Sequence, residues 1–385
     1  MSFLGFGKSN IYVYGKGIVN TSLLVENGKI SMIGNISNDD LVQLPENLIV
    51  IPGFVDKHIH GANHSDFMNP TREDLVNITS AIAHEGTTSC LATTMTQSME
   101  AIKAAVKNIG EYVKENNEGV EILGIHLEGP FVSPKFAGAQ PLEYIVKCDI
   151  DAFKEINEAS LNTVKEVSYA CEENGMDFTT YLVENNIVAS IGHSNSEYET
   201  VIKAADLGAS SVTHTYNAQR GIHHRDIGVA GAAMLDDRLS AELICDLIHV
   251  SPAAIKLLYK NKGKDGICLI TDSIEAKYMP DGEYSLGGQP VFVKDNAARL
   301  ASGTLAGSTL KLNEGVRNFK NTVGVSFTDA VDCATINPAK NLKVDDRKGS
   351  IELGKDADFT VVDEDFNVYM TVCRGKVVYS KLNYN

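Results

Sequence analysis

The sequence predicts an α/β protein whose larger part is a (β/α)8, TIM-like barrel and whose smaller part is a β-sandwich-type domain formed from both termini. Two patterns support this prediction. Between residues 51 and 349, apolar strand-like runs alternate with amphipathic helical runs about eight times. Both ends of the chain instead contain short β-rich pieces separated by turns. A doubly wound open sheet is the alternative for the central part.

The boundaries of these elements follow from the hydrophobic periodicity. Helical patterns follow most of the strands, for example at 72–86 and 98–116. Residues 279–309 predict a hairpin-like excursion, and a helix at about 308–319 follows with Ser308 as its N-cap. The small β domain is expected to comprise residues 1–50 and 350–385, and the catalytic barrel residues 51–349. The barrel strands are expected near 51–58, 87–94, 121–127, 164–170, 187–192, 210–213, 241–245 and 267–271.

Composition narrows the class of protein. The formal net charge of −16 argues against general binding to nucleic acid or to anionic membranes. The seven cysteines contain no C-x-x-C pair, which is typical of a reducing compartment rather than of a disulfide scaffold or zinc ribbon. The N-terminus lacks a signal-peptide pattern, and no apolar run approaches the roughly 20 residues of a membrane helix. We therefore expect a soluble, cytoplasmic protein.

The predicted chemistry depends on the carboxyl ends of the strands, where barrels of this type carry their active sites. His58 and His60 end the first strand, and residues two apart on a strand project to the same face, so both imidazoles can reach one ion. Glu128 ends the third strand, and His193 and His214 end the fifth and sixth. Each of them alone could be a packed or surface residue. Together they predict a metal site.

Asp272, at the end of the eighth strand, completes the predicted catalytic site. A divalent ion lowers the pKa of a bound water to about 7, which permits hydrolysis at neutral pH. Asp272 is expected to accept the proton of that water and to deliver it to the leaving group. The ion, or a nearby cation such as protonated His249, would polarise the carbonyl under attack. Residues 305–315 contain no G-x-S-x-G nucleophile elbow.

The segment 213–234 is long and polar for a barrel turn. It places Arg220 and Arg225 near His214 in a chain that is acidic overall. Backbone N–H groups near Asn217 and Ala218, together with an arginine, could hold a phosphate. A solvated loop without a specific ligand is the alternative.

These motifs together resemble a known family. Over essentially its whole length the chain resembles the amidohydrolase superfamily and, within it, the N-acetylglucosamine-6-phosphate deacetylases. The motif "PGFVDKHIHG" is typical of the superfamily, whereas "HLEGPF", "THTYNA" and "LITD" are more specific to the deacetylases. The resemblance also includes "IGHSN", "ICDLIHVSP", "LAGSTLKL" and "GKDADFTVVD".

The resemblance implies hydrolysis of the acetamide of N-acetyl-D-glucosamine 6-phosphate to D-glucosamine 6-phosphate and acetate. One or two divalent ions per subunit are implied, zinc first, with iron, manganese and cobalt as alternatives. The phosphorylated amino sugar is the implied partner, and a homodimer is the implied assembly. The implied metal ligands are Glu128, His193 and His214 for the primary ion, with His58 and His60 for a second ion that Glu128 bridges.

Further roles are implied residue by residue. Asp272 would be the general base and acid, and His249 would contact the substrate near the acetamide carbonyl or sugar hydroxyls. The sugar phosphate would be bound by Asn217, Ala218 and Arg225, with Arg225 able to reach across a dimer interface. The backbone near Leu305 and Ala306 would line the sugar pocket.

One departure from the family concerns Gln140, which stands where some members have a histidine. Gln140 can hydrogen-bond a sugar hydroxyl or a carbonyl but cannot carry a protonic charge. Three alternatives stay open: another N-acyl sugar, a cyclic amide, or a binding homologue without activity. His64, Asp66 and His126 are either partners that orient the ligands or simple neighbours.

Overall fold

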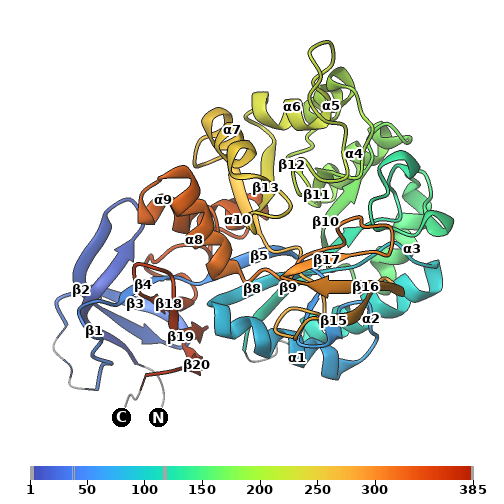
Figure 1. Ribbon diagram of the computed structural model, residues 1–385. Helices are drawn as coiled ribbons and strands as arrows, with labels where there is room; N and C mark the ends of the chain where they lie inside the picture. The colour runs from blue at the N-terminus through green and yellow to red at the C-terminus, as the bar shows by residue number, and fades with distance from the viewer. Residues whose placement is uncertain (1–3, 37, 39, 116–118, 383–385) are drawn as a thin grey trace.

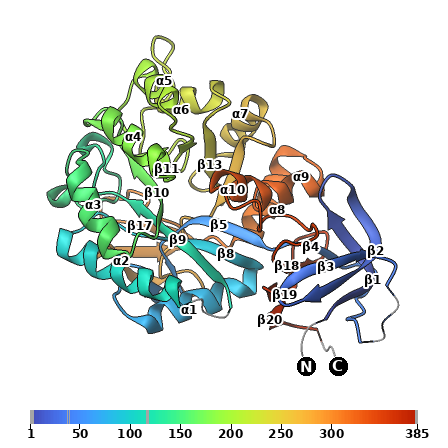
Figure 2. The same ribbon diagram turned by 180° about the vertical axis from the view of Figure 1, so that it is seen from behind.

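The computed structural model describes residues 4–36, 38, 40–115 and 119–382 (Figures 1 and 2). Figure 1 shows a barrel surrounded by helices and, beside it, a smaller sheet built from both ends of the chain. The predicted fold class is confirmed. Asn116, the last residue of the helix predicted over 98–116, lies outside the described residues.

Eight parallel strands form the barrel wall. The ring closes beyond the strand ends, where Asp272 N donates to His58 O at 2.8 Å and His60 N donates to Ser273 O at 2.9 Å. This closure excludes the open sheet. Each strand overlaps with a predicted one, although the first begins at Phe54 and not near 51. The strands are β5 (Phe54–Ile59), β8 (Thr87–Thr93), β9 (Glu121–Glu128), β10 (Val164–Tyr169), β11 (Val188–Ile191), β12 (Ser211–Val212), β13 (Ser240–Ile244) and β14 (Ile267–Ile270).

Helices cover the outside of the barrel (Figure 2). The side chain of Thr71 accepts from Asp74 N and starts α1, and the side chain of Ser98 accepts from Ala101 N and starts α2. The α-helices are α1 (Arg72–Ile82), α2 (Met99–Lys114), α3 (Ile150–Ala159), α4 (Gly175–Glu184), α5 (Tyr198–Asp206), α6 (Gly228–Leu235), α7 (Pro252–Lys262), α8 (Leu312–Val323), α9 (Phe327–Asp332) and α10 (Ile336–Asn341). Short 3-10 helices are η1 (Ala83–Glu85), η2 (Pro134–Phe136) and η3 (Leu142–Tyr144).

The terminal strands form one seven-stranded sheet in the order β20-β19-β18-β4-β1-β2-β3. Strand β4 pairs with β1 from the beginning of the chain and with β18 from its end, so it joins the two halves. The domain limits at 50/51 and 349/350 stay a prediction. The strands are β1 (Gly5–Val13), β2 (Gly17–Glu26), β3 (Lys29–Gly34), β4 (Ile49–Pro52), β18 (Phe359–Val362), β19 (Val368–Cys373) and β20 (Lys376–Ser380).

The expected excursion after the eighth barrel strand is a three-stranded antiparallel sheet of β15 (Gly282–Leu286), β16 (Gln289–Lys294) and β17 (Ala297–Arg299). A two-stranded piece, β6 (Gly61–Ala62) with β7 (Ser65–Asp66), follows β5. The prediction that Ser308 caps the next helix is wrong, because α8 begins after Lys311. Instead, Ser308 Oγ donates to Thr271 O and Ser308 N donates to Asp272 O, which fixes the strand end that carries Asp272.

An ionic cluster connects the barrel to the segment that leads into the terminal sheet. Lys348 Nζ lies 2.7 Å from Glu121 Oε2 on β9 and 2.5 Å from Asp358 Oδ2. Arg347 pairs with the other oxygen of Glu121 at 2.7 Å. Burial would raise the pKa of Glu121, but these cations outweigh it and lower the pKa to about 2.

Two expectations from composition can be compared with the structure. All seven cysteines are free and buried. Within the described part of the chain, no helix has the length and apolar character needed to cross a bilayer.

Candidate metal and substrate site

Glu128, the last residue of β9, is the centre of the candidate site. Its Oε1 lies 3.0 Å from His214 Nε2 and 3.2 Å from His193 Nε2. Its Oε2 lies 3.3 Å from His60 Nε2, and His58 Nε2 is 3.5 Å from Oε1. One buried carboxylate therefore brings together four imidazoles from three separate strand ends, as the sequence predicted.

Asp272 faces the same centre. Its Oδ1 lies 3.2 Å from His60 Nε2 and 3.5 Å from His58 Nε2. The backbone on both sides holds it in place, since its N–H donates to His58 O and its carbonyl accepts from Ser308 N. The predicted acid–base residue thus lies against the two histidines of β5.

Left-handed backbone marks three of these strand ends. His193, His214 and Asp272 have φ values of 45°, 29° and 50°. Such a conformation costs a non-glycine residue on the order of 1 kcal/mol, and strain of this kind is characteristic of functional sites. Here it turns the chain directly after the strand.

The carboxylates of the site attract positive charge strongly. Burial alone would lower the pKa of His58, but Glu128 and Asp272 outweigh it and raise that pKa to about 9. For His60, burial is likewise outweighed by hydrogen bonds to Asp272 and Glu128, and its pKa rises to about 10. Burial would raise the pKa of Glu128, yet the surrounding histidines hold it well below its ordinary range. The electrostatics therefore suit a bound cation.

The nitrogen and oxygen atoms of the site are also placed suitably for binding a cation. Around Glu128, two groups of three side chains have ligand atoms within 4.8 Å of one another: His58, His60 and Glu128, and Glu128, His193 and His214. The two groups share Glu128. His58 Nε2 is buried and has no hydrogen-bond partner among the described residues, which leaves its lone pair for an ion. Nitrogen and carboxylate ligands in this arrangement fit one or two divalent ions.

A cavity of about 310 Å³ opens directly onto this cluster. Its size suits part of a small polar ligand. His249 lies on its wall, and its Nδ1 is 2.7 Å from Asp246 Oδ2, so its other nitrogen is left for a ligand. The predicted residues that line the cavity are His60, Glu128, Gln140, His193, His214, Asn217, Ala218, His249, Asp272 and Leu305.

Comparisons with known proteins agree with this geometry. Residues 49–378 match the amidohydrolase family. The chain belongs to the amidohydrolase family. It is 42% identical over 363 residues to the N-acetylglucosamine-6-phosphate deacetylase of Bacillus subtilis (strain 168), with 92% of each chain covered. The resemblance read from the motifs is confirmed.

Two further relatives of this amidohydrolase bear on its substrate. The N-acetylgalactosamine-6-phosphate deacetylase of Escherichia coli O157:H7 is 35% identical, with 86% of this chain and 87% of the relative covered. A variant deacetylase from Mycobacterium smegmatis has been solved in complex with N-acetyl-D-glucosamine-6-phosphate. It matches this amidohydrolase with a TM-score of 0.92 and 28% identity, covering 99% of this chain and 100% of the other.

Three of the predicted residues do not line the cavity of the single chain: His58, Arg225 and Ala306. Arg225 is exposed and hydrogen-bonds His224 at 2.7 Å. Ala306 is fully buried, and its N–H donates to the carbonyl oxygen of Ala298 in β17. Its neighbours Leu305 and Gly307 line the cavity instead. The roles expected for Arg225 and Ala306 in this amidohydrolase stay predictions.

Sequence reasoning missed other residues of the cavity wall, among them Met95, Lys135, Phe136 and Leu286. Phe136 also orients the ring of His193, since its carbonyl oxygen lies 2.9 Å from His193 Nδ1. Lys135 and Phe136 belong to the segment directly after Glu128, and this closeness in sequence could have indicated that they line the cavity. Met95 and Leu286 have no such signal, because they are ordinary apolar residues in sequence.

Gln140 has a clear structural role. Its Nε2 donates to Glu128 Oε2 at 2.9 Å and its Oε1 accepts from Thr96 N at 2.8 Å. It therefore orients the central carboxylate, and the expected contact with a sugar stays a prediction.

The three ambiguous residues lie in different surroundings. Both ring nitrogens of His126 are engaged, Nδ1 with Lys57 O at 3.2 Å and Nε2 with Ser168 Oγ at 2.7 Å, so His126 is not a ligand. Asp66 accepts from Met68 N at 2.7 Å, and the ring of His64 lies 6.3 Å from that of Tyr284.

Proposed function

We propose that this amidohydrolase hydrolyses the acetamide of N-acetyl-D-glucosamine 6-phosphate to D-glucosamine 6-phosphate and acetate. The observation that carries the proposal is the position of Asp272 and four ligand-type side chains at the cavity of about 310 Å³, with the fifth, His58, 3.5 Å from Glu128. The identity of 42% with a deacetylase of this specificity supports the choice of substrate.

The proposed cofactor is one or two divalent ions per subunit. Glu128, His193 and His214 would hold one ion, and His58 and His60 would add a second that shares Glu128. Zinc is the first candidate, with iron, manganese and cobalt as alternatives, because all accept nitrogen and oxygen ligands. When bound, such an ion supplies a Lewis acid that acidifies water and polarises the amide carbonyl.

The protein's own residues then move the protons. Asp272 takes a proton from the attacking water as the water oxygen bonds to the acetamide carbon. It returns this proton to the amide nitrogen as the C–N bond breaks, so acetate and the free amine leave. His249, held through Nδ1 by Asp246, would hydrogen-bond the acetamide carbonyl or a sugar hydroxyl.

The phosphate would be bound by the loop after β12. Asn217 and Ala218 line the cavity, and Ala218 has a φ of 45°, which changes the direction of the local peptide groups. Arg225 is exposed in the single chain. We propose that it acts in the neighbouring subunit of a homodimer, where it would complete the phosphate site. A cytoplasmic location is part of the same proposal.

Acetate release from the zinc-loaded protein tests this function. N-acetylglucosamine 6-phosphate should be cleaved, and the unphosphorylated sugar should be a much poorer substrate. Correctly folded, metal-loaded protein that releases no acetate from the phosphosugar would remove the proposal. Equal rates with and without phosphate would instead remove the roles of Asn217, Ala218 and Arg225.

A second candidate substrate is N-acetylgalactosamine 6-phosphate, which differs at a single sugar carbon. The relative of Escherichia coli O157:H7 at 35% identity favours including it. Comparing kcat/KM for the two phosphosugars in one assay decides between them. A cyclic amide substrate such as a hydantoin serves as a control for a broader amidohydrolase activity.

A further inference from the structure

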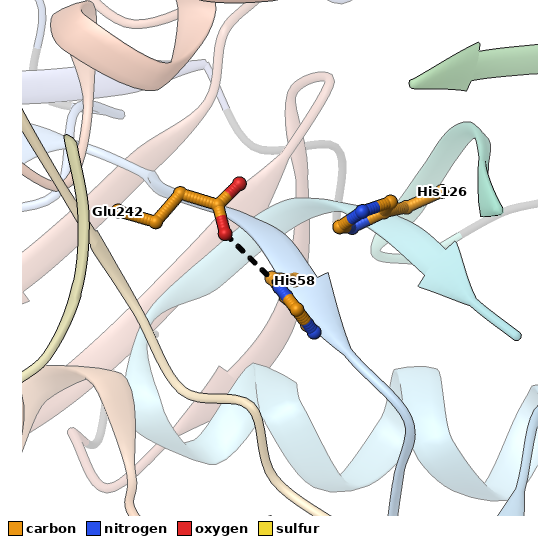
Figure 3. A group of neighbouring side chains, drawn as sticks. All are labelled: His58, His126 and Glu242. Carbon is orange, nitrogen blue, oxygen red and sulfur yellow. Dashed lines mark hydrogen bonds and ion pairs between the residues drawn. The ribbon is translucent and has the colours of Figure 1, made fainter. Parts of the chain in front are cut away.

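We propose that Glu242, on β13, is a positioning residue that holds His58 in the tautomer needed for metal binding. The proposal rests on the metal site of the proposed function. It concerns a residue inside the barrel that does not line the cavity. Figure 3 shows His58 between Glu242 and His126, with Glu242 joined to it by a hydrogen bond.

Three donors converge on the carboxylate of Glu242. His58 Nδ1 lies 3.0 Å from Oε2, and the backbone N–H of His214 donates to the same oxygen at 3.1 Å. Lys57 Nζ lies 3.0 Å from Oε1. Glu242 thus touches two proposed ligand residues, the ring of one and the backbone of the other. All of these side chains except that of His214 are completely buried.

The hydrogen bond determines which nitrogen of His58 carries hydrogen. A carboxylate can only accept, so Nδ1 of His58 must be the donor. In the neutral ring, Nε2 then keeps its lone pair, and Nε2 is the atom that faces Glu128 and Asp272 at 3.5 Å. A carboxylate behind a histidine is a common way of orienting a metal ligand.

The side chains in Figure 3 hold the ring of His58 in place and do not form another metal site. Although His58, His126 and Glu242 have atoms close enough for an ion, both nitrogens of His126 already form hydrogen bonds. The ammonium of Lys57 already pairs with Glu242. The ring of His126 packs edge-on against His58 with centroids 4.5 Å apart, which restricts the ring from the other side.

Glu166, on β10, provides a matched control. It is also fully buried and pairs with the same ammonium, with Lys57 Nζ 2.8 Å from its Oε1. Among the described residues, its carboxylate oxygens form no hydrogen bond with His58 or His214. Burial raises the pKa of Glu166, although the ammonium of Lys57 lowers it. Glu166→Gln and Glu242→Gln both remove a carboxylate that pairs with Lys57. Only Glu242→Gln also changes a contact of His58, a proposed metal ligand.

The glutamine in Glu242→Gln cannot serve all three donors. If its oxygen stays with His58 and His214, its NH₂ group faces the ammonium of Lys57. If the amide turns over, its NH₂ group faces His58 Nδ1 and favours hydrogen on Nε2, the ligand atom. In both orientations the carboxylate that fixed the ring is lost.

The test is metal affinity, measured with Co²⁺ by visible absorbance titration and with Zn²⁺ by elemental analysis after dialysis. We expect Glu242→Gln to weaken binding of the ion that uses His58 about 10- to 100-fold, as for other residues that orient ligands. Glu166→Gln should bind both metals like the wild type. Thermal unfolding of the metal-free proteins serves as the control that both variants are folded.

A double-mutant cycle provides a second measurement. In a His58→Ala background, Glu242→Gln should cause no further loss of metal affinity. Wild-type affinity in Glu242→Gln, equal losses in the two glutamine variants, or a full additional loss without His58 would each overturn the proposal. These measurements use metal alone, so failure of the phosphosugar assay is recognised separately.

Discussion

Exchanging Asp272 for asparagine separates proton transfer from metal binding. Asn has nearly the same shape but cannot take up a proton near neutral pH. Glu128 and the four imidazoles around it are untouched, and Asp272 Oδ1 lies 3.2 Å from His60 Nε2 and 3.5 Å from His58 Nε2. A positioned acid–base group contributes about 10²- to 10⁴-fold to the rate. Because Asp272 would act in both proton transfers, we expect a loss of kcat near 10⁴-fold, or about 5 kcal/mol in the barrier.

Two measurements on each protein check this prediction: initial rates of acetate release at saturating phosphosugar, and metal content per subunit. Asp237→Asn is the matched control, because Asp237 is exposed and lies at the turn between α6 and β13. Retention of more than about one tenth of the wild-type rate, a loss of only 1.4 kcal/mol, would refute the acid–base role. Normal folding with loss of metal would show that Asp272 is mainly a ligand.

Three further outcomes are expected. The pKa of Glu121 is lowered from 4.5 to about 2, so its carboxylate stabilises the fold above pH 4.5 and this contribution is lost as the pH falls towards 2. Urea unfolding should therefore show Glu121→Gln destabilised by about 2–3 kcal/mol at pH 7 and by less at pH 3, and a difference independent of pH would contradict this. Chelation should abolish acetate release and lower the Tm by several degrees, because an ion at 100 times its Kd stabilises by about 2.7 kcal/mol; added Zn²⁺ should restore both, and an unchanged Tm would argue against a resident ion. Arg225→Ala and Asp272→Asn subunits should each be inactive, but remixing them should restore about a quarter of wild-type activity if Arg225 serves the neighbouring site of a two-fold dimer; no recovery after verified subunit exchange would place Arg225 elsewhere.

The barrel could be predicted because its strands are continuous buried apolar runs, which identify themselves by length and by the turns around them. Strand β14, Ile267-Cys268-Leu269-Ile270, is apolar and buried at every residue and illustrates this pattern. The start of α8 could not be predicted in the same way. Ser308 is a good N-cap by residue type, but its hydroxyl and N–H bind the backbone at Thr271 and Asp272, and only the tertiary structure shows those partners.

The ligand cluster could be predicted because parallel strands end at one rim of the barrel, so residues distant in sequence meet there. His193, His214 and Glu128 follow this rule directly. The positions of Arg225 and Ala306 depend on loop conformation, for which the sequence offers no periodic signal.

The interior of the barrel is the part that sequence reasoning could least foresee. Lys57 follows Phe54-Val55-Asp56 in a strand, and a lysine beside a histidine would ordinarily be assigned to opposite faces. The pairing of β5 with β8 shifts register between Asp56 and Ile59. Lys57 thus reaches Glu166 and Glu242 across the barrel, while His58 reaches Glu128.

This register shift explains why charged residues occupy a position that most such barrels fill with branched apolar side chains. On β5 the charged Lys57 lies between apolar Val55 and the ligand-type residue His58, and on β9 the buried ring of His126 lies between Leu123 and Glu128. Apolar replacements of a buried ion pair are often at least as stable as the pair itself. A charged layer that lies directly behind the ligands and contacts two of them through Glu242 is therefore better explained by its effect on metal binding than by its contribution to stability.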